Sequence, residues 1–196
     1  MRTSMSSSIG CVTAAGLCLA LAACVSQPRG NEAALPPATP ASMQAALDKG
    51  DAAVAGALAA KDPARLTTAD KDGGLPLHTA AFRGDAATTK ALLDAGADPN
   101  TAKADGWTAL DLAAWKGHLD VARLLLDRGA KVDAKKPDGG TALHAAVMAG
   151  HKAVVDLLIS RGADVNARKT DGWTPLKFAK DRPEIADTLR KHGAKE

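Results

Sequence analysis

An aspartate followed by a glycine recurs four times in this chain at one fixed interval. The pairs are 33 residues apart, at Asp72-Gly73, Asp105-Gly106, Asp138-Gly139 and Asp171-Gly172. A fixed period between about 20 and 50 residues is typical of repeat architectures, in which each unit packs mainly on its neighbours. The period therefore predicts a solenoid of stacked units instead of one globular core.

The segments that begin at these pairs resemble ankyrin repeats. They read DGGLPLHTAAFRGD, DGWTALDLAAWKGH, DGGTALHAAVMAGH and DGWTPLKFAKDRPE, and the later halves read LLDAGADPN, LLDRGAKVD and LISRGADVN. The ankyrin fingerprint has a Thr-Pro-Leu-His helix start, an alanine pair and a Gly-His turn. The resemblance implies an all-α repeat solenoid, in which stacked ankyrin helix-turn-helix units are joined by hairpin-like loops.

Each recurring residue type also has a physical role in a repeat that forms two short helices, a turn and a loop. Threonines expected to cap the first helix are Thr108, Thr141 and Thr174. Leucines expected to point inward are Leu77, Leu110, Leu143 and Leu176. Glycines expected at the turn between the helices are Gly84, Gly117 and Gly150, and those expected to end the second helix are Gly96, Gly129 and Gly162. Asp111 and Lys177 stand in place of the family's histidine. Thr88 and Thr89 also depart from the pattern, and these departures predict a looser first repeat.

The repeats set the domain boundaries. They span 72–104, 105–137, 138–170 and 171–196, and residues 43–71 match the pattern in part and are expected to form an N-terminal capping repeat. At least about three units must stack before such an array is stable, and its terminal units need a polar outer face. The last segment carries Glu184, Asp187, Arg190 and Lys191, so we expect it to be a C-terminal capping repeat.

The first 23 residues resemble a bacterial lipoprotein signal peptide. Arg2 precedes an apolar run from Ile9 to Ala22, which is closed by Leu21-Ala22-Ala23-Cys24. A run of about 14 residues is short for a bilayer span but fits the apolar region of a signal peptide. The resemblance implies cleavage before Cys24, a diacylglyceryl group on its sulfur and acylation of its new amine. The alternatives are an ordinary signal peptide with an incidental cysteine, or an uncleaved N-terminal anchor.

The residues around this cysteine lead to an expected location. All cysteines, at positions 11, 18 and 24, lie in the leader or at its edge, so the mature chain has no disulfide. Val25 stands where an aspartate would retain a lipoprotein at the inner membrane in Gram-negative families, which favours an outer-membrane lipoprotein that faces the periplasm. Residues 24–42 therefore comprise the lipidated cysteine and a Pro/Ala-rich tether.

Composition argues against several classes of function. The net charge is only +3 and the charges alternate, so no basic stripe indicates nucleic acid as a partner. Ser160 is the only serine within the repeats, and no thiol follows Cys24, so a nucleophile for catalysis is missing. The five histidines occupy repeat positions without a metal-binding motif, and we expect them to make structural hydrogen bonds. We expect no enzyme activity, no metal and no cofactor.

Large apolar and basic residues recur at positions that vary between ankyrin repeats. By the resemblance, these positions line the concave face on which partners bind. The expected partner-binding residues are Phe82, Arg83, Trp107, Trp115, Lys116, Met148 and Trp173. Aromatic and arginine side chains are common anchors of protein interfaces. The alternative is that some of these rings only pack between repeats, and Phe178 fits that role best.

The sequence as a whole predicts a lipid-anchored ankyrin-repeat adaptor. It would bind another periplasmic or envelope protein through its concave face and would be anchored to the membrane by the lipid on Cys24. The first alternative is a periplasmic inhibitor or protector that occludes a specific enzyme or toxin. The second is a scavenger of a small molecule or metal, but the sequence offers no convergent set of ligand residues for that role.

Overall fold

The repeat segments fold into pairs of helices that follow one another along the chain. The computed structural model describes residues 40–70 and 72–195, which all belong to one unit, Leu35–Glu196. The predicted signal peptide 1–23, Cys24 and the tether up to residue 39 lie outside the described residues. None of the helices that the structure describes is long and apolar enough to cross a membrane.

Ten α-helices are present in residues 40–70 and 72–195, with one short 3₁₀ helix, η1 (Pro63–Thr67), and no strand beyond an isolated bridge between Ala102 and Thr108. The helices pair as α1 (Pro40–Lys49) with α2 (Ala52–Lys61), α3 (Pro76–Arg83) with α4 (Ala86–Asp94), α5 (Ala109–Lys116) with α6 (Leu119–Asp127), α7 (Ala142–Ala149) with α8 (Lys152–Ser160), and α9 (Pro175–Phe178) with α10 (Pro183–Lys191). This all-helical repeat architecture confirms the predicted fold class.

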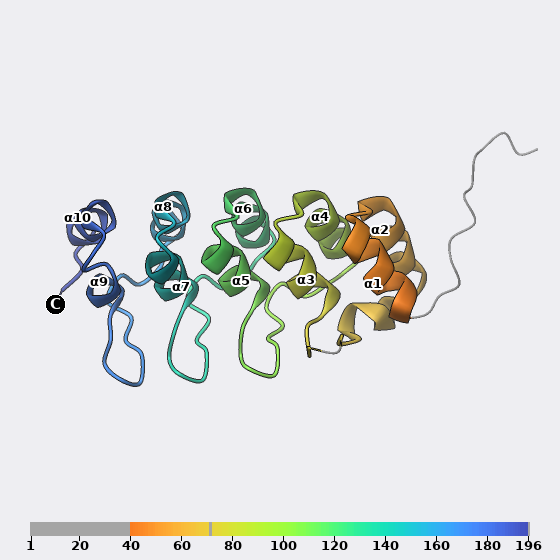
Figure 1. Ribbon diagram of the computed structural model, residues 1–196, viewed down its shortest axis with the longest axis horizontal. Coiled ribbons are helices and arrows are strands. Elements are labelled where there is room, and N and C mark those ends of the chain that lie inside the picture. The colour runs from red at the N-terminus through yellow and green to blue at the C-terminus, as the bar shows by residue number, and fades with distance from the viewer. Residues whose placement is uncertain (1–39, 71, 196) are drawn as a thin grey trace, which may run out of the picture. The chain divides into compact units, whose positions relative to one another are not determined.

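The helix pairs stack in two rows (Figure 1). The first helices α1, α3, α5, α7 and α9 contact one another in order, and the second helices α2, α4, α6, α8 and α10 do the same. From α3 onward, the loops that join one pair to the next project from the side of the first helices. The first helices and the loop tips therefore share one face of the repeat unit.

The buried residues explain the stacking. The four leucines expected to point inward are buried, as are Val121 and Leu125 of α6 and Val154 and Leu158 of α8. Small alanines on the first helices, such as Ala113 and Ala146, are fully buried and let neighbouring helices approach closely. One continuous apolar core runs through the described repeats. It provides the favourable burial energy that a single repeat could not.

The predicted turn glycines adopt the expected conformation. Gly117 ends α5 in the left-handed region with φ 78°. A Cβ added there would lie 2.5 Å from Nδ1 of His151, so both the backbone and the next repeat require glycine. Positive φ values occur at the other predicted positions too: Gly84, Gly96, Gly129, Gly150 and Gly162.

The terminal units continue the array at both ends. At the N-terminal end, α1 packs on α3 and α2 packs on α4, so the helices of the predicted capping segment continue both rows. At the C-terminal end, α10 buries Ile185 and Leu189. It exposes the four charged residues expected on a terminal cap: Glu184, Asp187, Arg190 and Lys191.

The predicted threonine caps have mixed outcomes. Thr108 accepts a hydrogen bond from the N–H of Asp111 at 3.2 Å, as expected. The prediction is wrong for Thr174, whose hydroxyl is buried without a hydrogen-bond partner. The N–H of Lys177 donates to the Thr174 carbonyl at 3.1 Å instead of to the hydroxyl. The exposed Lys177 also replaces the histidine or aspartate whose side chain meets this hydroxyl in the second and third repeats.

Thr88 and Thr89 of the first repeat are fully buried, but their hydroxyls form hydrogen bonds. Thr88 donates its hydroxyl to the Asp85 carboxylate at 2.5 Å, and Thr89 donates its own to the Asp85 carbonyl at 2.7 Å. Asp85 itself caps α4 by accepting from the N–H of Thr88 at 2.9 Å. A looser first repeat stays a prediction, and these bonds act against it.

Candidate functional site

The loop tips are built by the recurring Asp-Gly pairs. In the loop that leads into the second repeat, Lys103 N–H donates to the Trp107 carbonyl at 2.9 Å and Gly106 N–H donates to the Lys103 carbonyl at 2.9 Å, which closes a hairpin-like turn. The Asp105 carboxylate accepts the N–H of Trp107 at 3.1 Å. Corresponding bonds recur at Asp138 and Asp171. Asp105, Asp138 and Asp171 therefore act as turn formers.

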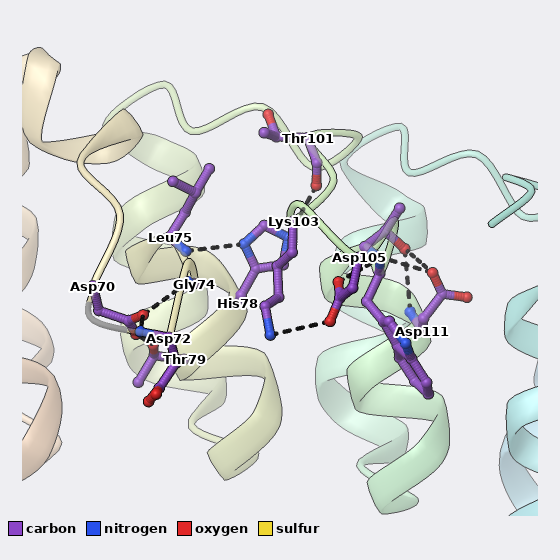
Figure 2. A network of polar contacts seen from close by, with 12 residues as sticks. Asp70, Asp72, Gly74, Leu75, His78, Thr79, Thr101, Lys103, Asp105 and Asp111 are labelled. Atoms are coloured by element: carbon purple, nitrogen blue, oxygen red, sulfur yellow. Dashed lines mark hydrogen bonds and ion pairs between the residues drawn. The ribbon is translucent and has the colours of Figure 1, made fainter. Parts of the chain in front are cut away.

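His78 joins the start of α3 to the loop that leads into the second repeat (Figure 2). Its Nδ1 accepts from Leu75 N–H at 3.2 Å, so Nε2 carries the proton and donates to the Thr101 carbonyl at 3.0 Å. Burial lowers the pKa of His78 because desolvation penalises the charged ring. His78 is therefore a neutral structural bridge between repeats.

Asp111 takes over only the local part of this role in the second repeat. It is 1 % exposed, and its carboxylate accepts from the N–H of Thr108 at 2.9 Å and from the Thr108 hydroxyl at 2.8 Å. Burial raises the pKa of Asp111 above its ordinary value. Both of these bonds lie at the start of α5, so Asp111 does not replace the bridge that histidine makes.

His144 restores the histidine arrangement in the third repeat. Its Nδ1 lies 3.2 Å from Thr141 N and 3.0 Å from the Thr141 hydroxyl, and its Nε2 lies 3.4 Å from the Trp173 carbonyl. Burial lowers the pKa of His144. The ring therefore joins the third repeat to the loop of the fourth.

The turn histidines hold the backbone of the preceding repeat. His118 donates from Nε2 to the Phe82 carbonyl at 3.1 Å, and His151 donates from Nε2 to the Trp115 carbonyl at 3.1 Å. His192 lies 2.9 Å from the Thr188 carbonyl through Nδ1. Each of the five histidines thus makes a backbone hydrogen bond, which confirms the structural role predicted for them.

The backbones of Phe82 and Trp115 are anchored in this way while their side chains stay in solvent. The exposed large apolar residues of the described chain are Phe82 at 46 %, Trp115 at 36 %, Met148 at 37 % and Trp173 at 43 %. Phe82, Trp115 and Met148 occupy the same repeat position on α3, α5 and α7. All four were predicted as partner-binding residues.

Cations and rings contact one another along this face. Lys116 Nζ lies 4.3 Å from the centroid of the Phe82 ring. Trp107 and Trp115 meet edge to face with centroids 6.2 Å apart, and Lys136 Nζ lies 3.9 Å from the centroid of Trp107. Trp107 is partly buried against the core, so it contributes to packing as well as to the surface.

A second aromatic group lies toward the C-terminal end. The rings of Trp173 and Phe178 have centroids 4.9 Å apart. Phe178 is partly buried against the core, in line with the packing role considered for it. A cleft of about 300 Å³ is lined by Trp107, Met148 and Phe178 among others. The structure therefore brings two predicted partner-binding residues, Trp107 and Met148, together with Phe178 at one depression.

A larger cleft of about 750 Å³, which the sequence did not predict, lies at the N-terminal end of the same face. Its apolar lining residues are Met43, Leu47, Pro76, Phe82 and Leu112. Arg83 also lines it, but its guanidinium already donates to the Leu47 carbonyl at 2.6 Å and to the Asp48 carboxylate at 2.6 Å. Arg83 therefore holds α1 against α3 as one wall of the cleft.

The sequence contained one signal for this cleft. Asp70, which lines it, occupies the repeat position that holds lysine in the later loops, at Lys103, Lys136 and Lys169. For residues 40–70 and 72–195, no three His, Cys, Asp or Glu side chains gather as a metal-ligand set. The arrangement supports noncovalent binding of a partner by exposed rings and two clefts.

The family model described as "Ankyrin repeats (3 copies)" matches residues 42–136 and 130–196. A search of curated proteins found no match to this chain.

Proposed function

Because the chain belongs to the ankyrin-repeat family, whose repeats generally mediate protein-protein interaction, we propose that it binds a protein partner through its first helices and loop tips. The observation that carries this proposal is the placement of Phe82, Trp115 and Met148. These exposed side chains recur at one repeat position and form a stripe across α3, α5 and α7. Apolar stripes of this kind are typical of interaction surfaces.

Binding by this face would cost little conformational freedom. Hydrogen bonds from His118 and His151 fix the backbones that carry Phe82 and Trp115. A surface that is already ordered loses less entropy on association, so more of the contact energy appears as affinity. The mechanism is equilibrium binding with no chemical step.

We also propose that the repeat unit is a lipid-anchored adaptor in the bacterial envelope. The support is the Leu21-Ala22-Ala23-Cys24 segment at the end of the apolar run, with Val25 after it and a proline-rich tether. Several acyl chains would hold the chain on the membrane far more firmly than a single chain. An outer-membrane lipoprotein facing the periplasm fits these residues best.

Lipid attachment is tested by metabolic labelling with a radioactive fatty acid in a host with lipoprotein machinery. The wild-type chain and the Cys18→Ser control should carry the label, and Cys24→Ser should not. An unlabelled wild-type chain would exclude the anchor at Cys24.

Partner binding is tested by chemical cross-linking in intact cells followed by mass spectrometry. We expect a specific envelope protein to cross-link to the wild-type chain and to the Arg123→Ala control on α6, and to be lost with Trp115→Ala. The identity of that protein distinguishes an adaptor, which would join an assembly component, from an inhibitor or protector, which would occlude an enzyme or toxin. Equal yields from both variants would contradict binding through the first helices.

A further inference from the structure

A pair of tryptophans on the outer side of α5 has a lysine at each end of the helix. Lys136, in the loop that leads into the third repeat, places its Nζ 3.9 Å from the centroid of Trp107, which lies just before α5. Trp107 meets Trp115 edge to face, with centroids 6.2 Å apart. Lys116 is the last residue of α5, and its Nζ lies 4.3 Å from the centroid of the Phe82 ring. We call these five residues the tryptophan strip.

The two lysines of the strip have no carboxylate partner. Among residues 40–70 and 72–195, Nζ of Lys116 and Nζ of Lys136 form neither a hydrogen bond nor an ion pair. Every residue from 72 to 195 is described, so the chain on both sides of each lysine is part of this comparison. An ammonium group has three donors, so each lysine can bind a carboxylate while it keeps its ring contact.

The acids near Lys136 are already paired with other lysines. Asp105 pairs with Lys103 at 3.5 Å, as Figure 2 shows, and Asp138 pairs with Lys169 at 3.1 Å. Both acids line the depression of about 300 Å³ that Lys136 also lines. The charge that stays unpaired in this depression is therefore positive. A carboxylate of a partner would complement it.

The surface between the two lysines is apolar. Trp115 is 36 % exposed, and Trp107 continues from it into the depression, where Met148 and Phe178 form further walls. A volume of about 300 Å³ is at the lower limit of ligand pockets, so it suits one large apolar side chain.

The length of α5 sets the spacing of the charges. The helix has eight residues and is about 12 Å long. An extended peptide covers that distance in about four residues at roughly 3.3 Å each, and residues two apart face the same side. Acidic residues about four positions apart can therefore reach both lysines, while the residue midway between them faces the tryptophans.

We propose that the tryptophan strip binds an extended acidic segment of the protein partner, in which two carboxylates about four residues apart flank a large apolar side chain. The carboxylates pair with Lys116 and Lys136. The apolar side chain packs on Trp115 and enters the depression beside Met148. This inference rests on the proposed function, because it specifies the chemistry of the partner on the same face.

The probe is a library of random peptides displayed on phage and selected on the full chain in mild detergent. We expect enriched peptides to carry Asp or Glu at two positions about four apart, with Leu, Ile, Met, Phe or Trp between them. Synthetic copies should bind the Lys116→Gln/Lys136→Gln variant about tenfold more weakly, equivalent to about 1.4 kcal/mol. The control Lys61→Gln/Lys191→Gln removes the same charge from the ends of α2 and α10 and should change affinity by less than about twofold.

Two further measurements keep the test independent of folding. Lys116→Gln alone alters an exposed side chain and should weaken binding in the same direction. Asn or Gln in place of the two acidic residues of the peptide should weaken binding to the unaltered chain by about tenfold.

Several outcomes would overturn the proposal. They are enrichment of basic or uncharged peptides, no enrichment, equal binding to the two double variants, and tighter binding of a single-stranded DNA oligonucleotide than of any enriched peptide. Peptides that lose affinity for Trp115→Ala but not for Lys116→Gln/Lys136→Gln would overturn it while leaving the proposed function intact.

Discussion

The inner and outer sides of the first helices are built differently. On the inner side, a leucine stands at the same position of every repeat, as at Leu110 and Leu143, and is buried each time. On the outer side, the corresponding residues are Phe82, Trp115 and Met148, which differ from one repeat to the next and are exposed. The same helices thus carry the buried core residues on one side and the proposed binding surface on the other, so substitutions should separate stability from binding.

The largest expected effect is on the inner side. Leu143→Ala removes a fully buried side chain and should lower the free energy of unfolding by about 2–5 kcal/mol. Met148→Ala, on the exposed side of the same helix, should lower it by less than about 0.5 kcal/mol. Denaturant unfolding followed by circular dichroism measures both. Similar losses in the two variants would mean that the outer residues also hold the stack together.

A pH-dependent effect is expected from the two buried histidines that bridge repeats. Burial lowers the pKa of His78 and His144 below the ordinary value of 6.5, so the folded state binds fewer protons than the unfolded state just below that pH. The stability contributed by these neutral rings is fully present above about pH 6.5 and is lost as the pH falls toward the lowered values. Unfolding experiments between about pH 7.5 and 5 should show this loss.

The matched variant for this experiment is His78→Asn/His144→Asn. An asparagine oxygen accepts the helix-start N–H, as the Asp111 carboxylate does in the second repeat, but it does not titrate. The variant should be less stable near neutral pH and should show a flatter dependence on pH. An unchanged slope would assign the acid sensitivity to other groups.

A smaller contrast is expected between two buried threonines at the same repeat position. Thr141→Val removes a hydroxyl that hydrogen-bonds the His144 ring at 3.0 Å and should cost about 1 kcal/mol. Thr174→Val removes a buried hydroxyl that has no partner, so it should be neutral or stabilising by up to about 1 kcal/mol. Melting temperatures of the two variants give the comparison. Equal destabilisation would show that Thr174 has a partner in solution.

The repeated part of the fold was predictable because it depends on local rules. The period, the left-handed glycines and the inward leucines all follow from residues within one repeat, and each has the expected place in the structure. The replacement of histidine by Asp111 can also be explained by a local rule, since a carboxylate can accept the N–H at the start of the helix.

The parts that the sequence did not predict depend on contacts between repeats. Arg83 reaches Leu47 and Asp48, 36 and 35 residues away, and no local pattern fixes such a pair. Trp107 follows a loop turn and was expected on the surface, yet it packs partly against the core. The N-terminal cleft requires α1 and the first loop to meet, so only Asp70 at a lysine position hinted at it.

The central claim is that the outer side of the first helices binds a protein. Its most direct test is isothermal titration of the cross-linked partner, once purified, into the wild-type chain and into Trp115→Ala, together with the melting temperature of each. The account predicts that Trp115→Ala weakens binding by about 1–4 kcal/mol while the melting temperature stays nearly unchanged. Wild-type affinity in a folded Trp115→Ala variant, or unfolding of that variant, would contradict it.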